Sequence, residues 1–272
     1  MKTKSVCVLT VLAILLGGCL LVAGCTQNQS SSGSGAAVSQ QNGTAVTKTY
    51  VIGVDGAYMP YSYIDKDGTF HGIDVDSARW IAKDKGFNVE FEAIEWDGMI
   101  PSLQAGKIDM VYSGMTITPE RQEQVNFSAP YLNINQTIAI RNDSSLSVDD
   151  ILAGKAIVGA QRGTTGAIWA EKNLVENGKM PADHLKEYDN FPLVITDLTN
   201  KNIDASIYDR PSHISAIEGK PIHIVYEIDT GEQYGVAIRK NDPELLALMN
   251  SGLADLQADP YWQKLLTEYK LA

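Results

Sequence analysis

Cysteine and histidine are scarce in this sequence, with 3 cysteines and 4 histidines among 272 residues. Two of the cysteines, Cys7 and Cys19, lie in an N-terminal segment that we expect to be removed, which leaves Cys25 alone. A single cysteine can form neither an internal disulfide nor a cysteine metal site. The histidines lack the spacing of metal ligands, and we expect them at surface or loop positions: His71, His184, His213 and His223. The sequence therefore predicts no metal centre and no cofactor.

One long apolar run stands near the N-terminus, at residues 6–22, after Lys2 and Lys4. It is too short and wrongly flanked for a membrane span, which predicts a signal peptide over residues 1–24. The run ends in Val22-Ala-Gly-Cys25, which resembles the lipobox of bacterial lipoproteins, where the cysteine is lipidated and becomes the new N-terminus. Cleavage as an ordinary signal peptide is the alternative, and either route exports the protein.

Basic residues are outnumbered by acidic ones. Removal of the signal peptide with its two lysines leaves 20 basic against 33 acidic residues, a net charge of −13. This balance argues against nucleic acid and against an anionic membrane surface as the partner. Residues 25–47 consist mainly of Gln, Ser, Gly, Asn and Thr, the composition of a flexible tether. A lipid on Cys25 is then the simplest anchor, at the outer face of the cell membrane.

The stretch 105–121 combines a buried strand with the start of a helix. An apolar run at 108–111 between glycines is typical of a short buried strand. Thr118 can cap a helix that begins at Pro119, which places Arg121 in the first turn beside free backbone N–H groups. An arginine placed there offers two parallel donors to a carboxylate. An arginine on a solvated helix face is the alternative that this stretch alone leaves open.

The rest of the chain alternates strands and helices, the signature of an α/β protein with parallel strands. We expect Asp74 to cap the first helix and Gly86 to end it. Further helices are expected at 99–103, 151–154, 166–174, 193–198, 211–218, 245–256 and 262–269. Strands are expected at 50–54, 89–93, 136–141, 156–158, 203–208 and 233–239. Ligands of such sheets bind beyond the carboxyl ends of the strands, where five candidate residues fall: Asp55, Tyr58, Trp96, Ser113 and Thr116.

Seven short motifs occur in a characteristic order: Gly72-Ile-Asp-Val-Asp76, Trp96-Asp-Gly-Met-Ile-Pro101, Gly106-Lys-Ile-Asp109, Met115-Thr-Ile-Thr-Pro-Glu-Arg121, Phe127-Ser-Ala-Pro-Tyr131, Gly163-Thr-Thr165 and Ile203-Asp204. Over residues 48–272 the sequence resembles a family 3 solute-binding protein of a polar amino-acid ABC transporter. The resemblance implies a two-lobed periplasmic-binding-protein-like fold (type II), in which each lobe is a sheet flanked by helices and two hinge crossings join the lobes. It implies a first lobe of residues 48–132 plus 235–272 and a second lobe of residues 133–234.

The same resemblance implies a clamp for a free α-amino acid. Arg121 would hold the α-carboxylate, helped by Thr116 and by the backbone N–H of Thr165. Asp209 would hold the α-ammonium from the second lobe. The other implied contacts are Ser113 and Gly114 as acceptors for the ammonium, Thr164 from the second lobe, and Asp55, Tyr58 and Trp96 around the ligand's side chain.

The implied function is an extracytoplasmic, non-enzymatic binding protein that delivers an amino acid to the permease subunits of an ABC importer. Asp55 can accept a hydrogen bond from the polar or cationic end of a ligand's side chain, so we expect the ligand to be a polar or cationic L-amino acid. Gly166 departs from the pattern of several relatives that bind cationic amino acids, because they carry a longer polar residue there. Two alternatives remain open: an enzyme on the same fold, similar to cyclohexadienyl dehydratase, in which an acid expels a leaving group, and an amino-acid sensor subunit.

Overall fold

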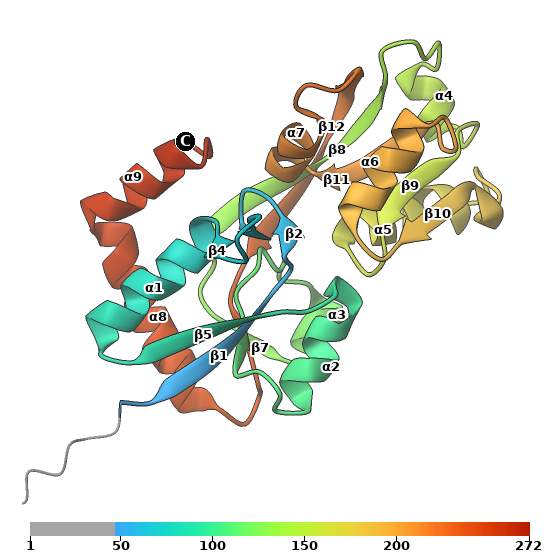
Figure 1. Cartoon of the computed structure of the whole chain (residues 1–272). Coiled ribbons are helices and arrows are strands. Elements are labelled where there is room, and N and C mark those ends of the chain that lie inside the picture. Colours follow the sequence, from blue (N-terminus) through green and yellow to red (C-terminus); the bar gives the residue numbers. More distant parts are fainter. Residues whose placement is uncertain (1–46) are drawn as a thin grey trace, which may run out of the picture. The chain divides into compact units, whose positions relative to one another are not determined.

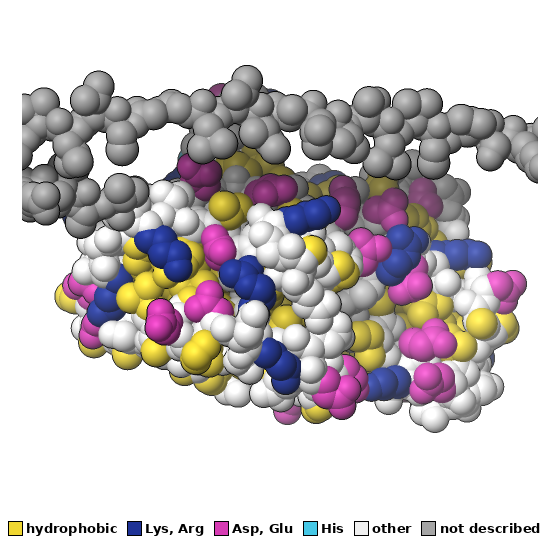
Figure 2. Space-filling view, turned by 90° about the horizontal axis from the view of Figure 1, so that it is seen from below, with side chains coloured by type: hydrophobic (Ala, Val, Ile, Leu, Met, Phe, Trp, Pro, Cys, Tyr) yellow, Lys and Arg dark blue, Asp and Glu magenta, His cyan; other side chains and the backbone are white. Residues whose placement is uncertain are grey.

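The computed structural model describes residues 47–272. The expected signal peptide, the lipidation of Cys25 and nearly all of the expected tether fall on residues 1–46, outside the described part. Within residues 47–272, no helix has both the length and the apolar character needed to cross a membrane. Figure 2 shows basic and acidic side chains interspersed over the face that it draws.

The first lobe is built on a five-stranded sheet with strand order β5-β1-β6-β13-β7. Strands β5, β1 and β6 run parallel, and β13 runs antiparallel to β6 and β7. A small three-stranded sheet, β2-β3-β4, follows β1. The strands of the lobe are β1 (Thr49–Val54), β2 (Ala57–Tyr58), β3 (Ser62–Ile64), β4 (Phe70–His71), β5 (Asn88–Ala93), β6 (Met110–Val111), β7 (Asn126–Phe127) and β13 (Ala237–Ile238).

Helices cover both faces of this sheet (Figure 1). Tyr50, Ile52 and Val54 of β1 pack in one apolar cluster with residues of α1 and α8, whereas Val51 packs on a second cluster that contains residues of α2. This alternation follows from the two-residue period of a strand, which sends successive side chains to opposite faces. The helices of the lobe are α1 (Ile73–Lys85), α2 (Met99–Gln104), α3 (Pro119–Gln122), α8 (Pro243–Ala258) and α9 (Pro260–Glu268).

The second lobe is built on a second five-stranded sheet, with strand order β10-β9-β11-β8-β12. Its strands are β8 (Leu132–Arg141), β9 (Val158–Gln161), β10 (Leu185–Tyr188), β11 (Ala205–Asp209) and β12 (Ile222–Tyr234). Its helices are α4 (Val148–Leu152), α5 (Thr165–Ala170), α6 (Phe191–Thr199) and α7 (Arg210–Ile217). A π-helical turn at Glu171–Val175 continues α5, and short 3-10 turns lie at Trp96–Gly98 and Ala182–His184.

Two long strands carry the chain between the lobes. β8 leaves the first lobe and β12 returns to it, and the two pair antiparallel with a register shift between Ile228 and Glu232. At the first-lobe end, the Tyr131 N–H donates to the Tyr234 carbonyl at 3.0 Å, and Thr116 bridges to Tyr234. The chain therefore has the predicted two-lobed periplasmic-binding-protein-like α/β fold with two crossings.

Several local predictions are confirmed. The Thr118 side chain accepts from the N–H of Arg121, as expected of a cap, and Pro119 begins α3. Gly86 ends α1 in the left-handed conformation, with φ 74°. Asp209 terminates the strand that precedes α7.

Other local predictions were wrong. Asp74 is not the cap of α1: the cap position is Gly72, and Asp74 is a buried residue of the first turn. Its carboxylate accepts instead from the Gly114 N–H at 2.6 Å and from the Tyr131 hydroxyl at 2.9 Å. The strand expected at 156–158 lies later, at β9, and β12 begins eleven residues before the expected 233–239.

The expectation that all histidines lie at the surface or in loops fails for His213. This residue of α7 is fully buried, and its ring nitrogens lie 2.9 Å from the Thr137 hydroxyl and 2.8 Å from the Ser206 hydroxyl. Burial lowers the pKa of His213 to about 3. The ring is therefore a neutral part of the second lobe's interior, since burial disfavours the charged form.

Candidate functional site

Eight of the predicted site residues line one cavity between the lobes. They are Tyr58, Trp96, Gly114, Thr116, Arg121, Thr164, Thr165 and Asp209, and Tyr208 joins them. The cavity has a volume of about 10 Å³, which leaves room for about one water molecule. The lobes are thus closed on each other, and entry of a larger molecule requires them to move apart.

Arg121 enters the cavity from the start of α3 and is buried, with 7% of its surface exposed. Its guanidinium donates to the Thr116 carbonyl at 2.8 Å and, across the lobes, to the Gly163 carbonyl at 3.0 Å. It also lies 5.4 Å from the centre of the Trp96 ring, within range of a cation–π contact. Of the five N–H donors of a guanidinium, two are engaged by these carbonyls. No carboxylate of the described chain lies within 4.0 Å of it.

Asp209 reaches the same cavity from the end of β11 in the second lobe. The carboxylate accepts from the Tyr58 hydroxyl at 2.6 Å and from the Gln136 side-chain amide at 2.6 Å. Burial, followed by repulsion from Glu232, raises the pKa of Asp209 to about 6. In the part of the chain that the structure describes, Asp209 has no ion-pair partner. It is therefore an acceptor whose charged form would be favoured by a cation.

Asp55 and Ser113 are not among the residues that line this cavity. The Asp55 carboxylate accepts from the Ala57 N–H at 2.8 Å and from the Gln161 amide of the second lobe at 3.0 Å. The Gln161 side-chain oxygen in turn accepts from the Tyr208 hydroxyl at 2.8 Å. Burial raises the pKa of Asp55. Asp55 is therefore connected to the cavity through Gln161, because Tyr208, which bonds to Gln161, lines the cavity.

The Ser113 hydroxyl supports the loop after β1. It accepts from the Asp55 N–H at 3.0 Å and lies 2.8 Å from the Ser62 hydroxyl. These contacts fix the backbone from which Asp55 projects. Ser113 therefore positions Asp55 and does not itself line the cavity.

Gly114 lines the cavity in a conformation that requires glycine. Its φ is 56°, and an added Cβ would lie 2.6 Å from a ring carbon of Tyr58 and 3.0 Å from one of Tyr234. The N–H of Gly114 donates to buried Asp74, whose pKa burial raises to about 7. Asp74 therefore positions the strand end that forms one wall of the cavity.

The second-lobe wall comes from the start of α5. Thr164 caps this helix, because its hydroxyl accepts from the Ala167 N–H at 3.3 Å while donating to the Gln161 carbonyl at 2.7 Å. The Trp96 indole donates to the carbonyl of Gly163 at 3.1 Å, and so ties this turn to the first lobe. At Gly166 an added Cβ would lie 2.8 Å from the Gln136 side-chain oxygen. A longer residue at this position, which several relatives have, would therefore require the Gln136 and Ile207 side chains to move.

Three residues beside the cavity escaped prediction: Gln136, Tyr208 and Glu232. Glu232, on the returning strand β12, accepts from the hydroxyls of Thr116 at 2.9 Å and Thr165 at 2.6 Å, and from Gln136 at 3.3 Å. Thr116 belongs to the first lobe and Thr165 to the second, so Glu232 connects both. The β-branched and aromatic residues of 222–230 were the available signal for this strand. Nothing in the sequence placed Glu232 beside the cavity.

Known proteins agree with the fold. The ancestral arginine-binding protein solved with bound arginine has 34% identity and a TM-score of 0.74, and the match covers 81% of this chain and 97% of that one. AncCDT-1, described as an ancestral amino acid-binding protein and a precursor of cyclohexadienyl dehydratase, has 35% identity and a TM-score of 0.72, covering 81% of this chain and 94% of that one. Among curated relatives, the L-cystine-binding protein TcyJ of Escherichia coli (strain K12) is 30% identical over 221 residues, 80% of either chain.

Fold and cleft together define a two-lobed binding protein. Residues 50–272 match the bacterial extracellular solute-binding proteins, family 3, and the chain belongs to that family.

Proposed function

We propose that this protein captures a free polar or cationic L-amino acid between its two lobes and delivers it to an ABC importer. Arg121 holds the α-carboxylate, with Thr116 and the start of α5 at Thr165 beside it. Asp209 holds the α-ammonium, and Tyr58, Trp96 and Thr164 enclose the ligand. Gly114 offers a backbone carbonyl beside the ammonium.

One observation carries this proposal: a buried cation and a buried anion, from different lobes, line the same cavity without pairing with each other. A buried charge is costly unless it is paired. Arg121 has unused donors, whereas Asp209 has a raised pKa that an added positive charge would lower. An α-amino acid supplies both missing partners on one small molecule.

The side-chain preference is proposed to depend on Asp55. A ligand with a polar or cationic tip reaches Asp55 by taking the place of the Gln161 amide, which donates to that carboxylate in the closed form. A hydrogen bond from a cationic tip to this carboxylate is stronger than the amide hydrogen bond that it replaces, because both of its partners are charged. The relatives are named for cystine and for arginine, which agrees with a polar or cationic range for the family.

A binding role is favoured over catalysis. The two ends of an α-amino acid account for both charged groups that line the cavity. Glu232 beside it is held by three hydrogen bonds, so no acid lining the cavity is left free to expel a leaving group. The precursor in the lineage of cyclohexadienyl dehydratase is itself described as an amino acid-binding protein. We therefore propose that the protein is not an enzyme, and incubation with prephenate or arogenate without an aromatic product would agree.

The organisation of the chain is part of the proposal. We infer export through the signal peptide at residues 1–24, a lipid on Cys25 and a tether to residue 47, followed by lobes of 48–132 plus 235–272 and of 133–234. A Cys25→Ser variant should leave the membrane fraction. Retention there would mean that the apolar segment itself is the anchor.

A thermal-shift screen against the twenty amino acids tests the function. Ligand bound only to the folded state raises the melting temperature with its affinity. Wild-type protein should respond to one or a few polar or cationic amino acids. Arg121→Ala should lose that response, since the loss of a buried charged partner weakens binding by roughly 2–5 kcal/mol.

The matched control is Arg79→Ala, because Arg79 is an exposed arginine of the first lobe that pairs with Asp76 at 3.1 Å. This variant should respond like the wild type. A normal response of Arg121→Ala would refute the assignment of the carboxylate site.

A further inference from the structure

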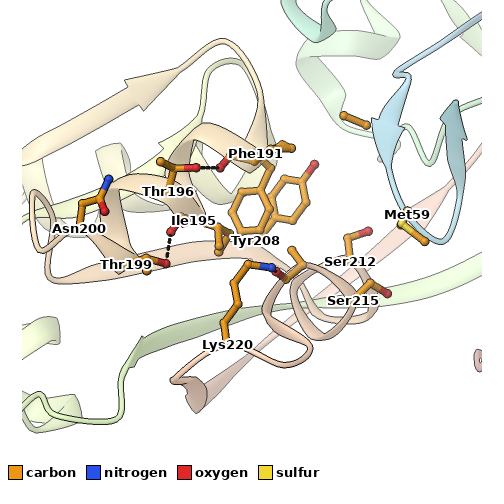
Figure 3. A pocket seen from close by; sticks show the side chains of 13 residues that line it. Met59, Phe191, Ile195, Thr196, Thr199, Asn200, Tyr208, Ser212, Ser215 and Lys220 are labelled. Carbon is orange, nitrogen blue, oxygen red and sulfur yellow. Dashed lines mark hydrogen bonds between the residues drawn. The ribbon is translucent and has the colours of Figure 1, made fainter. Parts of the chain in front are cut away.

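A second cavity, of about 550 Å³, lies outside the cleft, among α6, α7 and the β2 hairpin. Figure 3 shows its lining side chains, with Phe191 and Tyr208 as neighbouring rings. These rings stack with centres 3.6 Å apart and planes inclined by 6°, and form an apolar wall. Met59, which is 48% exposed, stands at the first-lobe side. The volume falls within the range of small-molecule sites.

One lining residue is a buried polar group without a partner. Ser212 of α7 is 2% exposed, and its hydroxyl makes no hydrogen bond with any residue of the described chain. Ser215, three residues later on the same helix, does bond to the Pro211 carbonyl, at 3.0 Å. An unsatisfied buried hydroxyl costs free energy unless something else bonds to it. The Ser212 hydroxyl oxygen is itself closed off from solvent, so it offers no hydrogen bond to an occupant of the cavity.

A positive charge stands at the rim. Lys220 lines the cavity, and its ammonium donates to the Ala216 carbonyl at 2.6 Å. This bond uses one of its three donors. Among described residues, no carboxylate lies within ion-pair distance of Lys220. The rim thus favours an anionic group, while the stacked rings and Ile195 favour an apolar body.

We propose that this cavity binds a small amphipathic anion, with an apolar body against Phe191 and Tyr208 and a carboxylate or sulfonate at Lys220. The occupant is not the amino acid of the cleft, because this cavity has an apolar wall and no carboxylate for an α-ammonium among its lining residues. The site is a second one, formed mainly by the second lobe.

Fluorescence titration of the purified protein with 1-anilinonaphthalene-8-sulfonate tests the proposal, with octanoate as a competitor. We expect saturable 1:1 binding that octanoate displaces and that the amino acid found in the thermal-shift screen does not displace. Thr196→Trp, at an exposed rim position of α6, should abolish binding by filling the cavity. Thr199→Trp serves as a second blocking variant should the first fail to fold.

Charge and hydrogen bonding are tested by three further variants. Lys220→Ala should weaken binding about three- to fivefold, as expected of a partly exposed ion pair. Lys186→Ala, which removes an exposed lysine of β10 outside the cavity, should leave binding unchanged. Ser212→Ala should leave binding unchanged, because this hydroxyl is closed off from the cavity, and should raise the melting temperature of the free protein, because it removes an unsatisfied buried hydroxyl.

Several results would overturn the proposal. Unchanged affinity in both tryptophan variants would place the probe elsewhere, and equal affinity in the two lysine variants would remove the anion site. Displacement of the probe by the amino acid would assign it to the cleft instead.

Discussion

We predict that Asp209 makes the affinity of the cleft for its amino acid depend on pH. Its carboxyl has a pKa of about 6 without ligand, owing to burial first and Glu232 second. The groups that face it are Tyr58, Gln136, Glu232 and Tyr234, with Arg121 across the cavity. A ligand ammonium requires the ionised carboxylate, so binding at low pH must first remove a proton.

The expected size follows from the pKa. At pH 5 about ten in eleven Asp209 carboxyls are protonated, so the dissociation constant should be about tenfold higher than at pH 8. Each unit below the pKa adds about 1.4 kcal/mol of cost. Calorimetry at pH 5, 6, 7 and 8, in buffers with different protonation enthalpies, should find nearly one proton released at pH 5 and none at pH 8.

The stability of the free protein should respond to pH in the opposite direction. A carboxyl whose folded pKa is raised above its unfolded value favours the folded state at low pH, and this contribution is lost as pH rises from about 4 to 6. The shift of Asp209 from 3.8 to about 6 amounts to roughly 3 kcal/mol. Asp74, with a pKa of about 7, adds a contribution of the same sign that extends to higher pH.

Asp209→Asn separates the two effects. It should bind weakly, with a dissociation constant that no longer falls between pH 5 and 8, and with a flatter dependence of unfolding free energy on pH. A wild-type dissociation constant that stays the same from pH 5 to 8 would refute the role of Asp209 as the ammonium acceptor.

Two further predictions concern the surroundings of the cavity. Gly114→Ala should lower the unfolding free energy by about 1–2 kcal/mol, because alanine is disfavoured in the left-handed conformation. It should also weaken binding, because the added Cβ displaces the Tyr58 ring. An unchanged midpoint of chemical denaturation would contradict this prediction. Glu232→Gln should lower the pKa of Asp209 and shift the pH midpoint of binding downward, because it removes the adjacent negative charge; calorimetry with an unmoved midpoint would show that this charge does not act on Asp209.

Local chemistry explains what the sequence could predict. Helix caps act within a few residues, so the sequence alone can predict them. Thr118 and Pro119 correctly predicted the start of α3 and the place of Arg121, and Gly86 correctly predicted the end of α1. The ends of strands in an α/β fold also locate a cleft in advance. This is why most of the predicted residues line one cavity.

Long-range pairing explains what the sequence could not predict. Asp74 looked like a helix cap, but its carboxylate is used by Gly114, forty residues away. Asp55 meets Gln161 across 106 residues, and Thr116 meets Glu232 across 116. The Asp74 contact depends on the packing of the first lobe, and the other two depend on how the lobes close; no local pattern specifies either.

The most direct test of the central claim is a crystal structure of the protein with the amino acid identified by the thermal-shift screen. The α-carboxylate should lie within about 3.2 Å of the Arg121 guanidinium nitrogens, and the α-ammonium within the same distance of an Asp209 oxygen. A ligand bound in the reverse orientation, or elsewhere on the protein with Arg121 and Asp209 left as they are, would contradict the account.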